Sequence, residues 1–165
     1  MKKLFLLLIP AALGAQKLNV TTGIHMLGGL NYKMEHEVFG AGIGLNYLPK
    51  KATALHMGAS FNYFNDFFPE KKGNENDFYV IKMQAAKPFA EWFTATTYLG
   101  YANTWENDIM KAFAGTYRTN LSWGVGVQAF DDTMTGELLF ESVAGYPHIS
   151  AGVRFNIVNL LKPQK

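Results

Sequence analysis

An all-β fold is predicted by three features of this sequence. Apolar and polar residues alternate strictly over residues 150–157, and the same two-residue period recurs along most of the chain. Aromatic residues make up 15% of the sequence, charged residues only 17%, and glycines number 16. This composition is unusual for a soluble domain of 165 residues. Together, the features predict an eight-stranded antiparallel transmembrane β-barrel with an up-and-down meander.

The first 15 residues are predicted to be a signal peptide. Two lysines precede an apolar run over residues 4–13, and the small residues Gly14 and Ala15 follow it. The run is shorter than the ~20 apolar residues that a membrane helix needs. Cleavage after either small residue fits the pattern. We expect an exported chain, with the barrel in residues 16–158 and a short periplasmic tail in residues 159–165.

The first three predicted strands each have one strongly apolar face. They cover residues 18–26, 39–47 and 53–63. In the second, Phe39, Ile43 and Leu45 lie on one face, whereas the other carries three alternate glycines and Asn46. The remaining strands are predicted over residues 79–85, 93–101, 121–129, 137–143 and 150–157. Alternation is weakest in residues 137–143 and clearest in the last strand.

The polar face of these strands distinguishes a barrel from a soluble β-sandwich, which also alternates. A sheet that faces water usually carries Lys, Glu and Thr, whereas this face is largely Gly, Ser, Asn and Ala. Such residues suit the narrow lumen of a small barrel. Tyrosines at the strand ends suit interfacial girdles. The membrane barrel is therefore favoured over the sandwich.

The predicted connections alternate in length. Short turns are expected at residues 49–52, 87–91 and 131–136, on the periplasmic side. Outer loops are expected at residues 28–37, 65–77, 103–116 and 145–147, so that three of the four are longer than the turns. This rhythm predicts extracellular loops and periplasmic turns.

The last strand carries a second signal. Its order, polar, any, Gly, any, any, apolar, any, apolar over residues 150–157, resembles the closing-strand signal of outer-membrane β-barrels. The layout resembles the small OmpX- and OmpA-type barrels. The resemblance implies a place in the bacterial outer membrane, contact with its lipid and lipopolysaccharide, and assembly by the barrel-insertion machinery. The chain departs from the common pattern by continuing past the final strand.

Charged residues are predicted inside the barrel. Counting along the strands places Lys82, Arg118, Glu137, Glu141 and Arg154 on the lumen face. Because the last two strands are neighbours, we expect Glu141 and Arg154 to meet there. A paired set would cross and block the lumen. The sequence therefore predicts a non-enzymatic barrel with a lumen filled by side chains and loops that have a structural or binding role.

Three aromatic residues mark a possible binding surface on the loops. Phe67, Phe68 and Trp105 fall where outer loops leave the strands. Exposed aromatic residues commonly anchor protein partners. The alternative, that they are girdle residues at the lipid interface, is favoured.

Two resemblances give alternative functions. The stretch from Phe140 to Gly145 resembles the region of the catalytic serine in lipid A deacylases, which would make Ser142 the nucleophile. That family has His two residues before its serine, where this chain has Phe140, so local activation is missing. The exported start, the first strand and the ending at residues 149–157 resemble the TraO family of conjugal-transfer outer-membrane proteins. That resemblance implies a part in a DNA-transfer apparatus.

Other kinds of site find little support. His25 and His148 fall on the first and last strands and His36 in the first loop, but no established metal-ligand spacing is present. The alternate glycines lack the dinucleotide-binding pattern, so no cofactor is expected. Without the two lysines of the signal peptide, 15 basic residues fall to 13 and balance the 13 acidic ones. This balance argues against a nucleic-acid partner.

Overall fold

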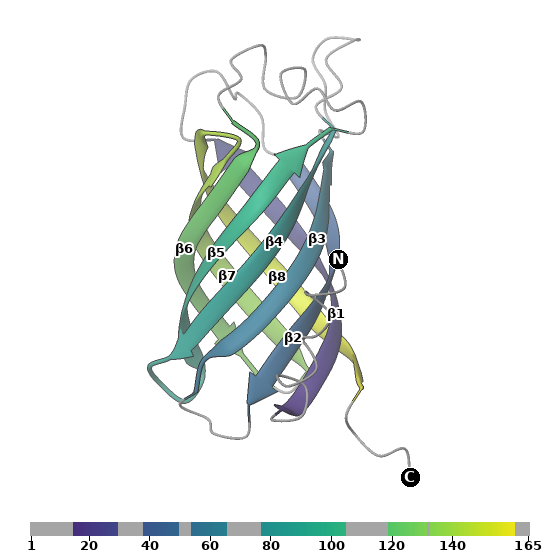
Figure 1. The fold of residues 1–165 in the computed structure, drawn as a ribbon, viewed down its shortest axis with the longest axis vertical. Helices are drawn as coiled ribbons and strands as arrows, with labels where there is room; N and C mark the ends of the chain where they lie inside the picture. Colours follow the sequence, from purple (N-terminus) through teal and green to yellow (C-terminus); the bar gives the residue numbers. More distant parts are fainter. Residues whose placement is uncertain are drawn as a thin grey trace, which may run out of the picture.

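The computed structural model is a closed barrel of eight antiparallel strands (Figure 1). The strands are β1 (Ala15–Gly29), β2 (Val38–Pro49), β3 (His56–Asn65), β4 (Phe78–Pro88), β5 (Phe93–Asn103), β6 (Leu121–Phe130), β7 (Met134–Val143) and β8 (Tyr146–Asn159). Residues 15–29, 38–49, 54–65, 77–104, 119–131 and 133–160 are described by the structure. Each strand pairs with its sequence neighbours, and β1 pairs with β8. The predicted meander of eight strands is confirmed.

The two ends of the barrel differ in their connections. We call the end with the β2–β3, β4–β5 and β6–β7 connections the turn end, and the opposite end the loop end. Residues 1–14 of the predicted signal peptide and most of the predicted tail lie outside the described residues, whereas Ala15 is the first residue of β1. Among the described residues, no helix is long and apolar enough to cross a membrane.

Two connections are shorter than the sequence predicts. The expected loop at residues 145–147 is a two-residue turn, because β7 ends at Val143 and β8 already begins at Tyr146. Ala144 and Gly145 have φ values of 52° and 87°. Positive φ at both central residues matches the twist of a tight hairpin. At the turn end, β7 begins at Met134, so the expected turn at residues 131–136 is shorter as well.

Asp131 fixes the β6–β7 turn. Its Oδ1 accepts hydrogen bonds from the Thr133 hydroxyl at 2.7 Å and from the backbone N–H groups of Thr133 and Met134 at 2.6 and 2.7 Å. These three hydrogen bonds hold the pKa of the Asp131 carboxyl below its usual value. The bond from the Thr133 hydroxyl contributes most to this lowering. The ionised carboxylate therefore supports this turn, and the support is lost as the pH falls through the lowered pKa.

The outer face of the barrel wall is apolar on every strand. A monomeric soluble protein rarely exposes a contiguous apolar surface of this extent. A wall of this kind is what a lipid-facing barrel requires. Its large exposed residues include Ile24, Ile43, Leu45, Met57, Ile81, Met83, Leu99, Leu121, Val125, Leu138, Phe140, Ile149 and Phe155.

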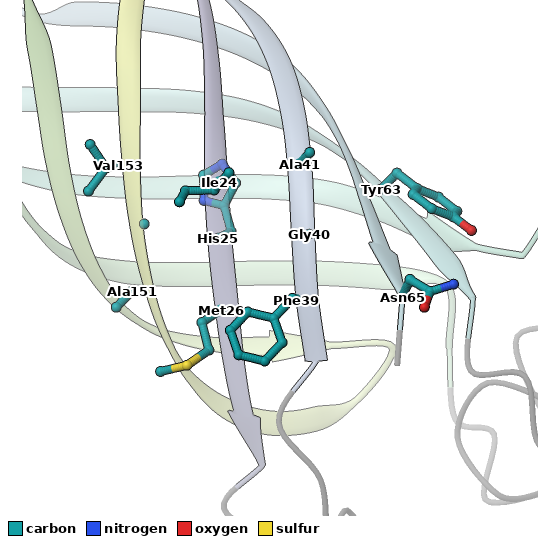
Figure 2. Close-up of a pocket in the computed structure, with 11 residues that line it drawn as sticks. Ile24, His25, Met26, Phe39, Gly40, Ala41, Tyr63, Asn65, Ala151 and Val153 are labelled. Carbon is teal, nitrogen blue, oxygen red and sulfur yellow. The ribbon is translucent and has the colours of Figure 1, made fainter. Parts of the chain in front are cut away.

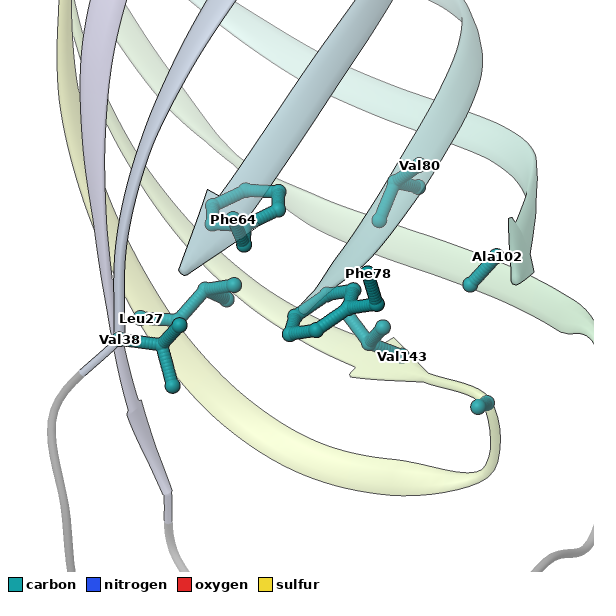
Figure 3. Packing of buried hydrophobic residues seen from close by; sticks show 8 residues of the cluster. Leu27, Val38, Phe64, Phe78, Val80, Ala102 and Val143 are labelled. Atoms are coloured by element: carbon teal, nitrogen blue, oxygen red, sulfur yellow. The ribbon is translucent and has the colours of Figure 1, made fainter. Parts of the chain in front are cut away.

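An apolar cluster fills the lumen at the loop end (Figure 3). We call it the apolar plug; it consists of Leu27, Val38, Phe64, Phe78, Val80, Ala102, Val143 and Ala144. The rings of Phe64 and Phe78 stack with centroids 5.1 Å apart. The sequence predicted a lumen face that is largely Gly, Ser, Asn and Ala, whereas at this end of the barrel the lumen face is apolar.

Candidate functional site in the barrel lumen

Four of the predicted lumen charges lie inside the barrel, on the turn-end side of the apolar plug. Lys82, Glu137, Glu141 and Arg154 are all buried. Both carboxylates come from β7, whereas the two cations come from β4 and β8. The fifth predicted residue, Arg118, lies outside the described residues. The four buried side chains carry two positive and two negative formal charges, so this set is neutral.

Lys82 and Glu141 form the ion pair nearest the plug. Lys82 Nζ donates a hydrogen bond to Glu141 Oε2 at 2.9 Å. The Tyr98 hydroxyl donates to the same oxygen. The Lys82 ammonium also lies 4.3 Å from the centre of the Tyr98 ring, within range of a cation–π interaction. Because β4 and β7 are three strands apart in the ring, this Lys82–Glu141 cluster bridges separate parts of the wall.

A glycine makes room for this cluster. Tyr98 lies over Gly124 of β6, and a Cβ at that position would overlap the tyrosine ring. The same Cβ would come within 2.9 Å of the Cβ of Glu141. The absence of a side chain at Gly124 thus lets the Tyr98 ring reach the carboxylate.

Glu137 is the centre of a second cluster, nearer the turn end. Its Oε1 accepts a hydrogen bond from Arg154 at 3.0 Å and lies 3.1 Å from His25 Nδ1. Its Oε2 accepts a hydrogen bond from Gln128 Nε2 at 3.1 Å. The four side chains come from β7, β8, β1 and β6. This Glu137 cluster therefore joins the strands on both sides of the β1–β8 seam.

Arg154 extends the Glu137 cluster across the lumen. Its second terminal nitrogen donates to Gln84 Oε1 at 3.3 Å, and Gln84 Nε2 donates to the Thr96 hydroxyl at 2.8 Å. Gln84 lies on β4, which is four strands from β8 in a ring of eight. The hydrogen bond from Arg154 therefore connects opposite walls of the barrel.

Comparison with solved structures shows the class of fold. A de novo designed transmembrane β-barrel superposes with a TM-score of 0.54 at 6% identity, covering 84% of this chain and 95% of the designed one. The fold is that of a transmembrane β-barrel. At this identity the likeness concerns the fold alone.

Natural barrels also resemble the chain, with lower scores. The N-terminal β-barrel domain of Pseudomonas aeruginosa OprF gives a TM-score of 0.46 at 14% identity, covering 86% of this chain and 100% of the domain. Neisserial surface protein A gives 0.42 at 13% identity, covering 86% and 96%. No protein-family model and no curated protein matches the sequence. None of these comparisons tests the resemblance to the TraO family.

The predicted contact between Glu141 and Arg154 is wrong. In the transmembrane barrel, Glu141 lies opposite His148 on β8, six residues before Arg154. At ~3.3 Å per residue, that offset is about 20 Å along the strand. Arg154 lies opposite Thr135 and reaches the nearer carboxylate of Glu137 instead. The strands were correctly predicted to be neighbours, but their register separates the two side chains.

His25 on β1 and His148 on β8 do not come together as a metal site. His25 lies opposite Gly152, four residues from His148, an offset of about 13 Å at ~3.3 Å per residue. Within the described ranges, no group of three or more His, Cys, Asp or Glu residues is placed to hold a metal ion. His36 lies outside those ranges. His25 contacts Glu137 instead.

The deacylase resemblance depends on Ser142, which the structure places away from the buried His148. Ser142 lies on the outer-facing positions of β7 with Phe140, whereas His148 is fully buried on the lumen side of β8. The serine and this histidine are thus on opposite faces of the wall. The loop residues Phe67, Phe68 and Trp105 lie outside the described residues.

Several lumen residues were missed by the sequence analysis. Tyr98, Gln84 and Gln128 each lie between two outward-facing positions, on the face that was predicted to point inward. The predicted lumen network was limited to residues with formal charges. Counting every hydrogen-bonding side chain at an inward position would have found all three.

Proposed function

We propose that the protein is a non-enzymatic outer-membrane β-barrel whose lumen is closed to solutes and whose loops form its working surface. The observation that carries the proposal is the hydrogen bond between Arg154 and Gln84, which connects opposite walls of the lumen. The fold resembles those of bacterial outer-membrane barrels. The closing-strand signal and the apolar outer wall support the same placement.

Three layers of side chains support the closed lumen. The apolar plug lies at the loop end, the Lys82–Glu141 cluster follows, and the Glu137 cluster lies toward the turn end. A barrel of eight strands has an interior only wide enough for side chains. Each described buried charge has an oppositely charged partner, so an entering ion would have to displace a paired group.

The closed lumen is tested by conductance. Purified protein in planar bilayers is expected to give no steady channel conductance, because the three layers block the path. A general-diffusion porin inserted in the same way is the positive control for insertion and detection. Stable, uniform channels from the unmutated protein would contradict the closed-lumen proposal.

The loop end is proposed to face the cell exterior. The loop over residues 65–77 contains Glu70, Lys71, Lys72, Glu75 and Asp77, and such a charged segment is poorly suited to hydrocarbon. A peptide tag inserted at Gly73 is expected to be labelled on intact cells. Labelling that requires permeabilisation of the outer membrane would reverse the proposed orientation. Lipopolysaccharide and the barrel-insertion machinery are the partners that this placement implies.

A protein partner at the loops is the remaining part of the proposal. Simultaneous replacement of Phe67, Phe68 and Trp105 by alanine is expected to remove a partner that uses them as anchors. The measurement is the set of proteins that co-purify with the tagged barrel. An unchanged set would leave the three residues as membrane-interface aromatics, the role that their position at the strand ends favours.

A further inference from the structure

The outer wall of the barrel has a groove outside the lumen (Figure 2). Its volume is about 490 Å³, within the ~300–1,000 Å³ of small-molecule sites. The groove crosses β8, β1, β2 and β3. Most of its lining consists of outward-facing apolar side chains, among them Ile24, Met26, Phe39, Ala41, Ala151 and Val153.

The groove exists because small residues lie between large ones. In one row of the register, Ala41 lies between Ile24 of β1 and Tyr63 of β3. In the next row, Ala151 of β8 lies opposite Met26. Gly40 and Gly152 line the groove only with backbone, because a Cβ at either position would point into the lumen, toward Phe64 or His25. The depression is therefore encoded in the sequences of four adjacent strands.

One end of the groove is polar. Tyr63 and Asn65 line it at the loop end of β3. The Tyr63 hydroxyl donates to Asp77 Oδ2 at 2.6 Å, and the Asn65 side chain donates to Asp77 Oδ1. The groove thus has an apolar length on the membrane-facing wall and a hydrogen-bonded polar group at one end.

The shape of the groove restricts what can fill it. The outer wall of a second barrel is convex, so its shape matches a hollow in another convex wall poorly. A helix, at ~10 Å across, is far wider than the gap left by single small residues. A hydrocarbon chain is narrow and flexible, and it is what surrounds this wall in a bilayer. We propose that the groove holds one acyl chain of a membrane lipid, with the polar part of that lipid beside Tyr63, Asn65 and Asp77.

The preference of an acyl chain for the groove over bulk lipid is expected to be small. A chain in bulk lipid is already out of water, so entering the groove gains nothing from the hydrophobic effect. The gain comes from closer van der Waals contact with Ile24, Met26 and the groove floor. We therefore expect an occupancy about fivefold above that of other outward positions, the ratio that a small packing free energy gives.

Photolabelling tests the proposal. The barrel is reconstituted in phosphatidylcholine vesicles that contain a small fraction of phosphatidylcholine with a diazirine in the middle of one acyl chain. After illumination, labelled residues are located by peptide mass spectrometry. Labelling is expected to concentrate on Ile24, Met26 and Ala41, about fivefold above Leu99 and Ile81, which are equally apolar positions outside the groove.

Matched variants distinguish lipid binding in the groove from general contact of lipid with the outer wall. Ala41→Phe with Ala151→Phe fills the groove and is expected to abolish the concentration of label on β1. Ala95→Phe adds the same bulk to an exposed alanine on β5, outside the groove, and is expected to leave it unchanged. Circular dichroism and heat-dependent gel mobility confirm that each variant is folded.

Two outcomes would overturn the proposal. Even labelling of all outward positions would mean that the groove holds only exchanging bulk lipid. Cross-linked pairs of barrels at groove residues would identify a second copy as the occupant. The proposal rests on the membrane placement of the barrel and not on its closed lumen, so a conducting barrel with selective labelling would leave it intact.

Discussion

Replacing Glu141 with alanine is expected to lower the free energy of unfolding by about 3–5 kcal/mol, the usual cost of breaking a buried ion pair. The substitution leaves the Lys82 ammonium buried without its carboxylate and removes the acceptor of the Tyr98 hydroxyl. Urea unfolding of the barrel in detergent micelles or lipid vesicles, followed by tryptophan fluorescence, measures the change as a lower midpoint.

A double variant distinguishes the lost pair from general damage. Glu141→Leu with Lys82→Met removes both charges, and it is expected to recover most of the stability, because an apolar pair leaves no buried charge behind. Glu91→Ala, at an exposed position in the β4–β5 turn, is the matched control and is expected to change stability by less than ~0.5 kcal/mol. An unchanged midpoint for Glu141→Ala, or a double variant no more stable than the single one, would show that the pair does not stabilise the barrel.

Phe64→Ala is expected to cost about 3–5 kcal/mol, as other large-to-small changes in packed cores do. Phe64 is 1% exposed inside the apolar plug and stacks on Phe78, so the truncation opens a cavity that its neighbours cannot fill. The same urea experiment measures the loss. Phe140→Ala removes an identical side chain from the outer wall, where lipid can fill the space, and it is expected to cost less. Equal losses for the two variants would mean that the plug is not tightly packed.

The strands could be predicted from the sequence because a wall with one lipid-facing side enforces a period of two. Strand ends are less well specified, since the alternation fades where chains leave the membrane. β8 begins at Tyr146 rather than near residue 150, because two residues suffice for the tight turn at Ala144 and Gly145. Residues with positive φ are allowed at such a turn, and a sequence alone rarely reveals an alanine in that role.

The lumen could be predicted in part. Parity along each strand placed Lys82, Glu137, Glu141 and Arg154 on the inward face, and all four side chains are buried in the structure. Parity does not give the register of the strands, and the register determines which side chains meet. Arg154 binds Glu137 on the adjacent strand. Glu141 binds Lys82, which lies on a strand that is not adjacent to its own. Contacts across an eight-stranded ring follow from closure and tilt, which no local pattern contains.

The apolar plug escaped prediction for a different reason. At the loop end, apolar residues occupy both faces of a strand, as in the pair Tyr63 and Phe64 and the run from Phe78 to Ile81. The sequence analysis assigned the tyrosines at the strand ends to interfacial girdles and gave no role to Phe64 or Phe78. Adjacent apolar residues at a strand end were the available signal that the lumen there is also apolar.

The placement of both described lumen carboxylates on β7 has a consequence for assembly. Glu141 meets Lys82 only when β4 to β7 have curved into a ring, and Glu137 meets His25 only when β1 has come around to β8. A half-assembled, open sheet in a bilayer would hold these carboxylates in hydrocarbon without their partners, which is costly. Partly formed sheets are therefore disfavoured relative to both the unassembled chain and the finished ring. Charge pairing makes the folding of this barrel cooperative, with closure of the seam as the step that completes it.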